Sequence, residues 1–201
     1  MFLLVHTPVV SASEYLEREK LALDRSEYNN REITQIPASQ PSHSLICVNL
    51  LCNFMGFADE LNFLQQKAFY HIFSIQLRLY IPEYNSFTYP DVIMIDKNKM
   101  IYDEKDYYVQ NPLLIIEVFS PKTENNDRGW KFEAYRAIPS LQEYVLVAQN
   151  RCHIEQYSRN SENQWLLKEY SNPQNFIQFT SIPFQLEINT IYENTEIYIE
   201  K

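Results

Sequence analysis

The apolar run from Leu113 to Phe119, LLIIEVF, constrains the fold of this chain more than any other segment. A short, nearly continuous apolar run is typical of a central β-strand that is buried on both faces. Glu117 interrupts the run, and a carboxylate inside such a strand destabilises the fold unless it is paired or bound to a metal ion. Glu117 alone does not decide between an ion pair with a nearby lysine and a metal site.

A second carboxylate, Asp91, lies in another apolar strand, predicted over 89–95, directly after Pro90. If the two strands are neighbours, Asp91 and Glu117 can project into one cleft at the edge of the sheet. Two carboxylates at close range repel each other, so one must take up a proton unless a divalent cation neutralises them. Oxygen ligands suit Mg²⁺ or Mn²⁺ rather than zinc, and such an ion can activate water and stabilise charge on a phosphoryl group.

A third charged group follows on the next predicted helix, which begins near Asp127. Asp127 and Lys131 are four residues apart and therefore share a helix face. One interpretation is a surface ion pair of little energetic value. The other is that Lys131 leans back toward the cleft, where its ammonium group would orient the attacking water or counter the charge of the transition state.

Strands and helices are mixed along the chain, so we expect an α/β (α+β) fold in which helices flank a mixed central β-sheet. No repeat, low-complexity segment or linker divides the sequence, so residues 1–201 are expected to form one domain. The other predicted strands span 27–37 (two strands around Asn29-Asn30), 73–80, 144–148, 153–157 and 165–170, with a polar loop over 96–110. The predicted helices span 15–23 (after a capping box, Ser11 to Glu14), 42–57, 127–138 and a short segment after 189–190.

The composition excludes several classes of protein. The two glycines, Gly56 and Gly129, rule out a glycine-rich phosphate loop. The three cysteines form no C-x-x-C pair and no cluster with histidine, which argues against structural zinc and favours reduced thiols in the cytosol. The N-terminus lacks the basic and apolar regions of a signal peptide, and no apolar run is expected to reach membrane-spanning length. We therefore expect a cytoplasmic protein without a membrane partner.

The order of the charged residues resembles the Uma-two family, a bacterial group of restriction-endonuclease-like proteins within the PD-(D/E)XK nuclease superfamily. The resemblance runs from about Ser13 to near the C-terminus, and the ordered set is specific although a single Pro-Asp motif is weak. The matching motifs are Tyr89-Pro90-Asp91-Val92, Asn111-Pro112-Leu113, Glu117-Val118-Phe119-Ser120, Thr123, Asp127, Lys131, Tyr135 and Glu143-Tyr144, preceded by Glu27-Tyr28, Glu32-Ile33 and His43.

The resemblance implies a restriction-endonuclease-like core and a metal-dependent endonuclease that hydrolyses the phosphodiester bonds of DNA. It implies that Asp91, Glu117 and Val118 bind Mg²⁺ or Mn²⁺. It also implies that Glu27 reaches the catalytic site from the first helical region of the chain.

Two positions depart from the expected patterns. The superfamily's usual lysine, two residues after the acidic residue, is replaced by Phe119, so Lys131 is the first candidate for the catalytic lysine and Lys122 the second. The family commonly has an Asp-Gly turn after the Glu27 region, where this chain has Asn30-Arg31. Asparagine tolerates the unusual backbone conformation of such a turn, so the fold is expected to survive.

The net charge of −9 does not suit a broad DNA-coating surface, because nonspecific affinity for DNA comes mainly from lysine and arginine. It favours an alternative hypothesis, a non-catalytic relative that keeps the fold and works through a partner. The retained Asp91, Glu117 and Lys131 favour the nuclease. The sequence does not determine the DNA target or the oligomeric state, which could be that of a monomer or a homodimer.

Several lesser candidates have a simpler structural interpretation. His43 could make a polar contact near the cleft, but a lone histidine is more often structural. Arg78, expected on the exposed face of strand 73–80, and Arg128, at the start of a helix, could meet phosphates, but a solvated face is the simpler interpretation for both. Cys47 and Cys52 lie in an apolar predicted helix and are expected in the core.

Overall fold

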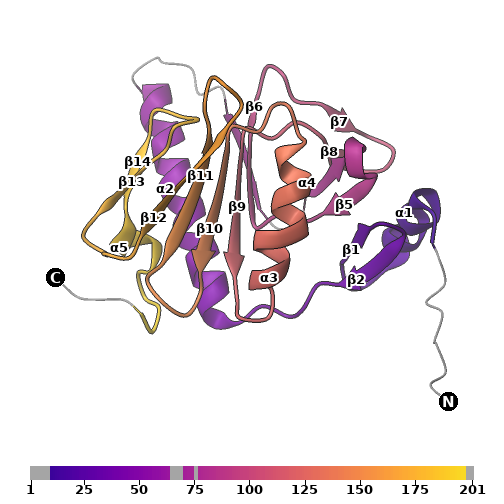
Figure 1. The fold of residues 1–201 in the computed structure, drawn as a ribbon, viewed down its shortest axis with the longest axis horizontal. Helices are drawn as coiled ribbons and strands as arrows, with labels where there is room; N and C mark the ends of the chain where they lie inside the picture. The colour runs from indigo at the N-terminus through magenta and orange to yellow at the C-terminus, as the bar shows by residue number, and fades with distance from the viewer. Residues whose placement is uncertain (1–9, 64–69, 75–76, 198–201) are drawn as a thin grey trace.

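The computed structural model describes residues 10–63, 70–74 and 77–197, and its centre is a six-stranded sheet in the order β12-β11-β10-β9-β6-β3 (Figure 1). The pair β9–β10 is parallel and the other pairs are antiparallel, so the sheet is mixed, as predicted. The apolar run forms β9, which lies inside the sheet and is buried along its whole length. The strands are β3 (Tyr70–Ser74), β6 (Val92–Asp96), β9 (Leu114–Phe119), β10 (Glu143–Ala148), β11 (Ile154–Arg159) and β12 (Trp165–Tyr170).

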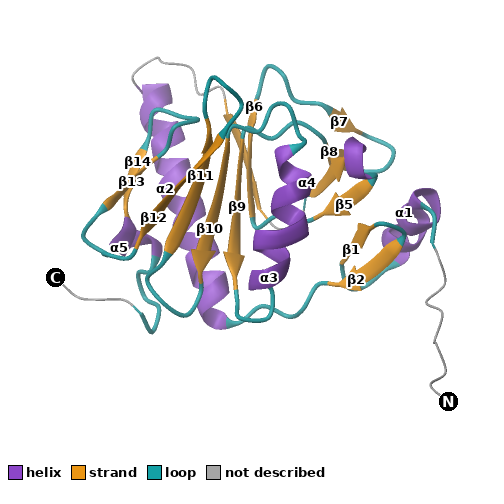
Figure 2. Cartoon of the chain, viewed as in Figure 1, coloured by secondary structure: helices purple, strands orange, loops and turns teal. Residues whose placement is uncertain are grey.

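Helices cover both faces of this sheet (Figure 2). One face packs on α2 (Pro41–Phe63), and the other packs on the helical segment formed by α3 (Glu124–Asn126), η2 (Asp127–Lys131) and α4 (Phe132–Arg136). Because successive strand residues face opposite sides, Val118 joins the core cluster of Leu50, whereas Phe119 joins that of Ala134. By the same alternation Glu117 faces the α3–α4 side, which decides which residues it can meet.

A second sheet, in the order β2-β1-β5-β4-β8-β7, lies beside the first (Figure 1). Glu27 lies on its strand β1. The second sheet packs on α1 (Ala12–Leu21) through Tyr15, Tyr28 and Phe87. The predicted cap of α1 is confirmed, since the amide of Glu14 donates to the side chain of Ser11. The strands are β1 (Ser26–Asn29), β2 (Glu32–Gln35), β4 (Arg78–Ile81), β5 (Ser86–Thr88), β7 (Tyr102–Asp103) and β8 (Tyr108–Val109), with a 3₁₀ turn η1 (Pro82–Tyr84) between β4 and β5.

The hairpin of β1 and β2 forms without the family's usual Asp-Gly turn. Its central residues are Asn30 and Arg31, one position later than the predicted turn, and their φ angles are 47° and 69°. Left-handed conformation at both central positions matches the right-handed twist of the flanking strands. The register pairs Glu27 with Thr34 and so determines the position of the Glu27 carboxylate along the strand.

The strand predicted over 73–80 is wrong as a single element. β3 pairs with β6 in the central sheet, whereas β4 pairs with β5 and β8 in the second sheet. The Leu77 amide donates a hydrogen bond to the Ser74 carbonyl, and residues 75–76 lie outside the described part of the chain. The alternating pattern continues because Phe73 of β3 and Leu79 of β4 pack in the same core cluster, although the two strands lie in different sheets. The predicted loop over 96–110 likewise contains β7 and β8.

The C-terminal third confirms the strands predicted over 144–148, 153–157 and 165–170, and adds a hairpin of β13 (Phe176–Gln178) and β14 (Gln185–Glu187). The last short helix, α5 (Ile188–Ile191), begins slightly before the predicted position. α2 is longer than the predicted 42–57 and continues to Phe63. Cys47 on this helix is buried as expected, whereas the core position predicted for Cys52 is wrong because Cys52 lies on its exposed side. The helix predicted from Asp127 begins earlier, at Glu124.

Contrary to the sequence-based expectation, α2 is long and apolar enough to cross a membrane by length and composition alone, over Pro41–Leu61. Its residues Ile46, Leu50 and Phe54 pack in the core against the central sheet. Core helices of soluble proteins meet the same criterion, so this finding is weak evidence for a membrane span.

Candidate metal-binding cleft

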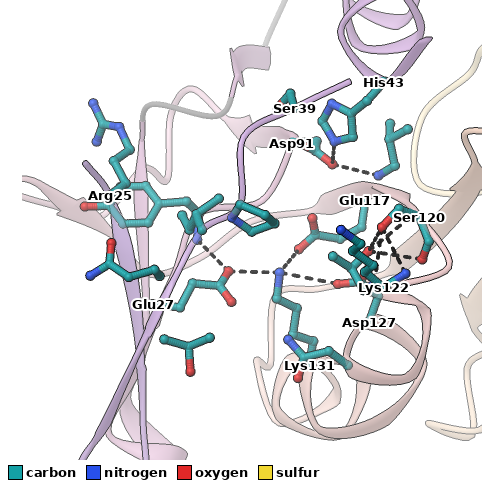
Figure 3. A pocket seen from close by; sticks show the side chains of 18 of the residues that line it. Arg25, Glu27, Ser39, His43, Asp91, Glu117, Ser120, Lys122, Asp127 and Lys131 are labelled. Carbon is teal, nitrogen blue, oxygen red and sulfur yellow. Dashed lines mark hydrogen bonds and ion pairs between the residues drawn. The ribbon is translucent and has the colours of Figure 1, made fainter. Parts of the chain in front are cut away.

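A cleft of about 710 Å³ collects the residues singled out in the sequence (Figure 3). Its lining comes from the β1–β2 hairpin, the segment leading into α2, the end of β9 and the start of the α3–α4 segment. Among the lining residues are Glu27, Asp91, Glu117, Val118 and Lys131. Asp91 and Glu117 therefore face one cleft, as expected if their strands are neighbours, and β6 and β9 do pair.

Asp91 directly precedes β6, beside the last residues of the neighbouring strand β9. Val92 pairs with Ile116, so Val118 extends beyond the paired part of β9. The amide of Val118 donates instead to Oδ2 of Asp91, at 2.7 Å. His43 Nε2, from the first turn of α2, lies 3.2 Å from the same oxygen. Within the described residues the contacts of Asp91 use Oδ2, and Oδ1 is left without a partner.

Lys131 occupies the centre of the acidic side of the cleft. Its Nζ lies 2.9 Å from Glu27 Oε1, 3.1 Å from Glu117 Oε1 and 3.4 Å from Asp127 Oδ1. The Tyr135 hydroxyl also donates to Glu117 Oε1, at 2.8 Å. The ion pair that was one interpretation of Glu117 therefore exists, and it lies in the same cleft as Asp91.

The charges in this cluster perturb one another because they are buried. Burial raises the pKa of Glu117 well above its usual value, against the opposing effect of the Lys131 ammonium group. Burial also raises the pKa of Asp127. For Lys131, burial lowers the pKa, but the carboxylates of Glu117 and Glu27 outweigh it and hold the pKa well above its usual value. Lys131 is thus positively charged at neutral pH, whereas the carboxyl groups of Glu117 and Asp127 bind protons more readily than in water.

The backbone around Lys131 departs from a regular α-helix. Residues Asp127–Lys131 form a π-helical turn, and Gly129 within it has φ −93° and ψ −112°. Such turns alter which side chains share a helix face and are frequent at functional sites. Here Asp127 and Lys131 are both buried and both point into the cleft, rather than forming a surface pair.

The structure corrects how some residues reach the cleft. Glu27 comes from strand β1 and not from the first helical region. Lys122 is exposed at the edge of the cleft, whereas Lys131 is buried within it. His43, interpreted as structural, contacts Asp91 directly. Gln149, which follows β10, lines the cleft and had not been singled out, because nothing in the local sequence marks it.

The arginines considered for phosphate contact are engaged within the fold. Arg78 is buried, donates to the Tyr89 hydroxyl and to the Asp106 carbonyl, and is therefore not on an exposed face as predicted. Its strand faces the α1 layer of the second sheet, where Arg78 lies over the ring of Tyr15. Arg128 pairs with Glu155.

Comparisons with known proteins agree with this architecture. A crystal structure described as a "putative nuclease belonging to DUF820" from Anabaena variabilis superposes with a TM-score of 0.71, covering 91% of this chain and 97% of that one at 16% identity. Two uncharacterized proteins of Synechocystis sp. are similar in sequence. The protein sll1609 is 34% identical over 90% of this chain and 98% of its own length. The protein slr1290 is 30% identical over 92% of each chain.

The family model described as "Uma2: Putative restriction endonuclease" matches residues 12–190. This match spans both sheets and the cleft between the β1–β2 hairpin and β9. The resemblance seen in the order of the charged residues is confirmed, together with the mixed fold that it implied. The chain belongs to the Uma2 family of restriction-endonuclease-like proteins.

Proposed function

We propose that this protein is a divalent-metal-dependent endonuclease that hydrolyses DNA phosphodiester bonds in the cleft described above. One observation carries the proposal: four buried carboxylates, from Glu27, Asp91, Glu117 and Asp127, line one cleft with the buried ammonium group of Lys131. An excess of buried negative charge is costly without a further cation. The family description, a restriction endonuclease, supports the same reaction class.

The donors present fit magnesium or manganese. Asp91 and Glu117 are bonded through Oδ2 and Oε1, which leaves one oxygen of each carboxylate available within the described part of the chain. The carbonyls of Leu113 and Phe119 accept bonds on the β10 side, so the alternation of β9 turns the Val118 carbonyl toward Asp91. Asp91, Glu117 and Val118 would hold the ion. When bound, such an ion supplies an activated water and neutralises charge on the phosphoryl group.

The remaining residues have roles that follow from their contacts. Lys131 carries a fixed positive charge 3.1 Å from Glu117, where it can orient the attacking water or counter the charge that develops on phosphate. Glu27 and Asp127 hold the ammonium group in place. Tyr135 fixes Glu117 through its hydroxyl. Lys131 is thus the catalytic lysine in this proposal, and Lys122 lies at the edge of the cleft.

DNA is the proposed substrate despite the net charge of −9. Basic groups are gathered at the cleft, where Arg25 and Lys122 line it together with Lys131. Carboxylates outnumber these basic groups in the metal-free cleft, so a bound metal ion together with Arg25, Lys122 and Lys131 would confine phosphate binding to the site itself. We place this activity in the cytoplasm. A non-catalytic relative is the second candidate function, because the ion pairs of Lys131 would also hold the fold together without any chemistry.

Asp91→Asn is expected to remove Mn²⁺ and Mg²⁺ binding and all cleavage of plasmid DNA, because it deletes a charge that the ion requires. Calorimetric titration and a plasmid assay with each metal measure the two effects. The matched control is Asp96→Asn at the opposite end of β6, where Asp96 pairs with Lys99 outside the cleft. Wild-type protein that binds neither metal would refute the metal-dependent nuclease and leave the non-catalytic relative.

Metal affinity is expected to rise with pH. A cation and a proton compete for the same carboxylates, and the pKa values of Glu117 and Asp127 are raised in the metal-free protein. Protons therefore remain bound at a pH where free carboxylates are already ionised, and the ion must displace them. Calorimetry in two buffers with different ionisation enthalpies should show proton release that declines as pH increases from about 5 to about 8. Affinity that does not change over this range would contradict the raised values.

A further inference from the structure

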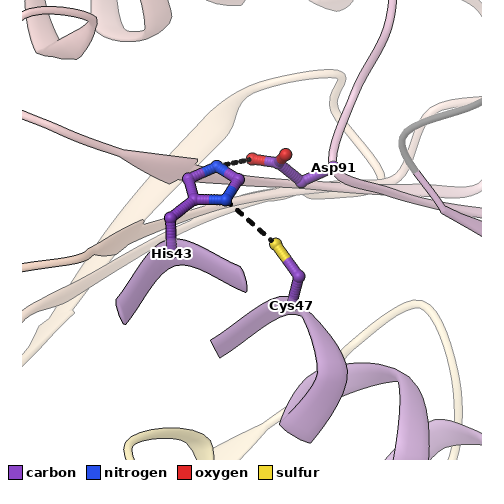
Figure 4. A group of neighbouring side chains, drawn as sticks. All are labelled: His43, Cys47 and Asp91. Atoms are coloured by element: carbon purple, nitrogen blue, oxygen red, sulfur yellow. Dashed lines mark hydrogen bonds and ion pairs between the residues drawn. The ribbon is translucent and has the colours of Figure 1, made fainter. Parts of the chain in front are cut away.

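We propose that His43 and Cys47 form a second metal site, for a thiophilic divalent ion such as Zn²⁺ or Co²⁺, with Asp91 supporting the histidine. Ligand atoms of these three side chains lie within 4.8 Å of one another (Figure 4). The site adjoins the one proposed for magnesium and shares Asp91 with it. Its existence does not depend on nuclease activity.

The spacing of His43 and Cys47 suits one ion. They are four residues apart on α2, so both side chains project from the same face of the helix. Cys47 Sγ lies 3.6 Å from His43 Nδ1. A tetrahedral zinc ion with bonds of about 2.3 Å to sulfur and about 2.1 Å to nitrogen separates those two atoms by about 3.6 Å. The metal-free protein therefore already holds the pair at the separation that the ion requires.

Asp91 gives the histidine the orientation of a metal ligand. His43 Nε2 lies 3.2 Å from Asp91 Oδ2, and that oxygen also accepts the Val118 amide. With the Nε2 proton directed to the carboxylate, the lone pair of Nδ1 faces Cys47. A metal-bound histidine usually donates its other ring N–H to a carboxylate, which raises the basicity of the nitrogen that binds the metal.

Charge and access favour a cation at this position. Burial raises the pKa of the Cys47 thiol, and so do the negative charges of Asp91 and Glu117. Those same charges attract a divalent ion. On binding, the thiol proton passes to solvent and the sulfur forms its bond to the ion, so metal binding releases one proton. His43 lines the cleft and gives the ion a route from solvent, and water completes the coordination.

The two sites differ in the ions that they should select. Oxygen donors at Asp91, Glu117 and Val118 suit magnesium, whereas a sulfur and a nitrogen suit zinc or cobalt. We expected no cluster of cysteine and histidine. The structure departs from that expectation because His43 and Cys47 share one face of α2 and contact each other there, and the docking of this face adds Asp91.

Cobalt absorption spectroscopy tests this site directly, because a sulfur-to-cobalt charge-transfer band appears only when a thiolate binds the ion. The protein to use carries Cys52→Ala and Cys152→Ala, which leaves Cys47 as its single thiol. Titration with Co²⁺ should produce the band, Zn²⁺ should remove it and excess Mg²⁺ should not. Cys47→Ala should abolish the band, and its metal-free melting temperature shows whether it folds.

Further variants keep the test decisive if Cys47→Ala does not fold. His43→Asn removes the nitrogen ligand at a residue that lines the cleft, and it should also abolish the band. Asp91→Asn should keep it but weaken Co²⁺ affinity by roughly 10- to 100-fold, as loss of an outer partner does. No band in the single-thiol protein, or a band that persists without Cys47, would overturn the proposal. Absence of Mg²⁺ binding would count against the nuclease and leave the cobalt result unaffected.

Discussion

Lys131→Ala is expected to abolish DNA cleavage and to destabilise the metal-free protein. The ammonium group is buried among Glu27, Glu117 and Asp127, so its removal leaves three carboxylates without their shared cation. Breaking a buried ion pair from one side costs about 3–5 kcal/mol, which a melting curve in chelator would detect. Cleavage should fall by at least about 10²-fold, as when one preorganised charge is lost from a reaction centre. Metal affinity should be kept or increased, because a competing positive charge is removed.

Saturating Mn²⁺ should restore much of the lost stability of this variant, since the ion then neutralises the carboxylates. Lys131→Arg should rescue activity only in part, because a broad planar guanidinium group cannot replace a compact ammonium. Lys122→Ala is the control, since Lys122 is exposed at the edge of the same cleft. Full activity in Lys131→Ala together with loss in Lys122→Ala would reverse the assignment of the catalytic lysine.

Glu117→Gln is expected to remove metal binding without lowering stability in metal-free buffer. The amide has the shape of the carboxylate, and its oxygen can still accept from Tyr135 and Lys131. Burial disfavours the charge on Glu117, as its raised pKa records, so removing the charge removes a cost. Lys131 keeps Glu27 and Asp127 as counter-ions. Calorimetry with Mn²⁺ and melting curves with and without metal measure the two halves of this expectation.

A second buried strand glutamate provides the matched control. Glu155 on β11 pairs with Arg128 outside the cleft, and desolvation of Glu155 is outweighed by hydrogen bonds from Arg128 that lower its pKa. Here the charged form stabilises the fold, so Glu155→Gln should lower the melting temperature and leave metal binding intact. A strong loss of stability in metal-free Glu117→Gln as well would mean that Glu117 serves a structural ion pair.

Features that depend only on residues close together in the sequence were predictable from it. The run LLIIEVF predicted a central strand, and β9 is buried along its length with Glu117 on the α4 side. The capping box predicted the cap at Ser11, although α1 begins at Ala12 and not at the predicted Tyr15. The ordered motifs identified the family, and several of their residues, among them Asp91, Glu117 and Lys131, line one cleft. These features follow from periodicity and local hydrogen bonding, which the chain expresses over a few residues.

Tertiary structure alone decided which distant groups meet. The docking of α2 sets His43 and Cys47 against Asp91, and the pairing of the β1–β2 hairpin brings Glu27 to Lys131. The alternating pattern over 73–80 looked like one strand, because periodicity reports which face is buried and not which sheet buries it. Local pattern determines the face on which a side chain lies, whereas the partner it meets there depends on how separate elements pack, and that packing is settled by contacts far apart in the sequence.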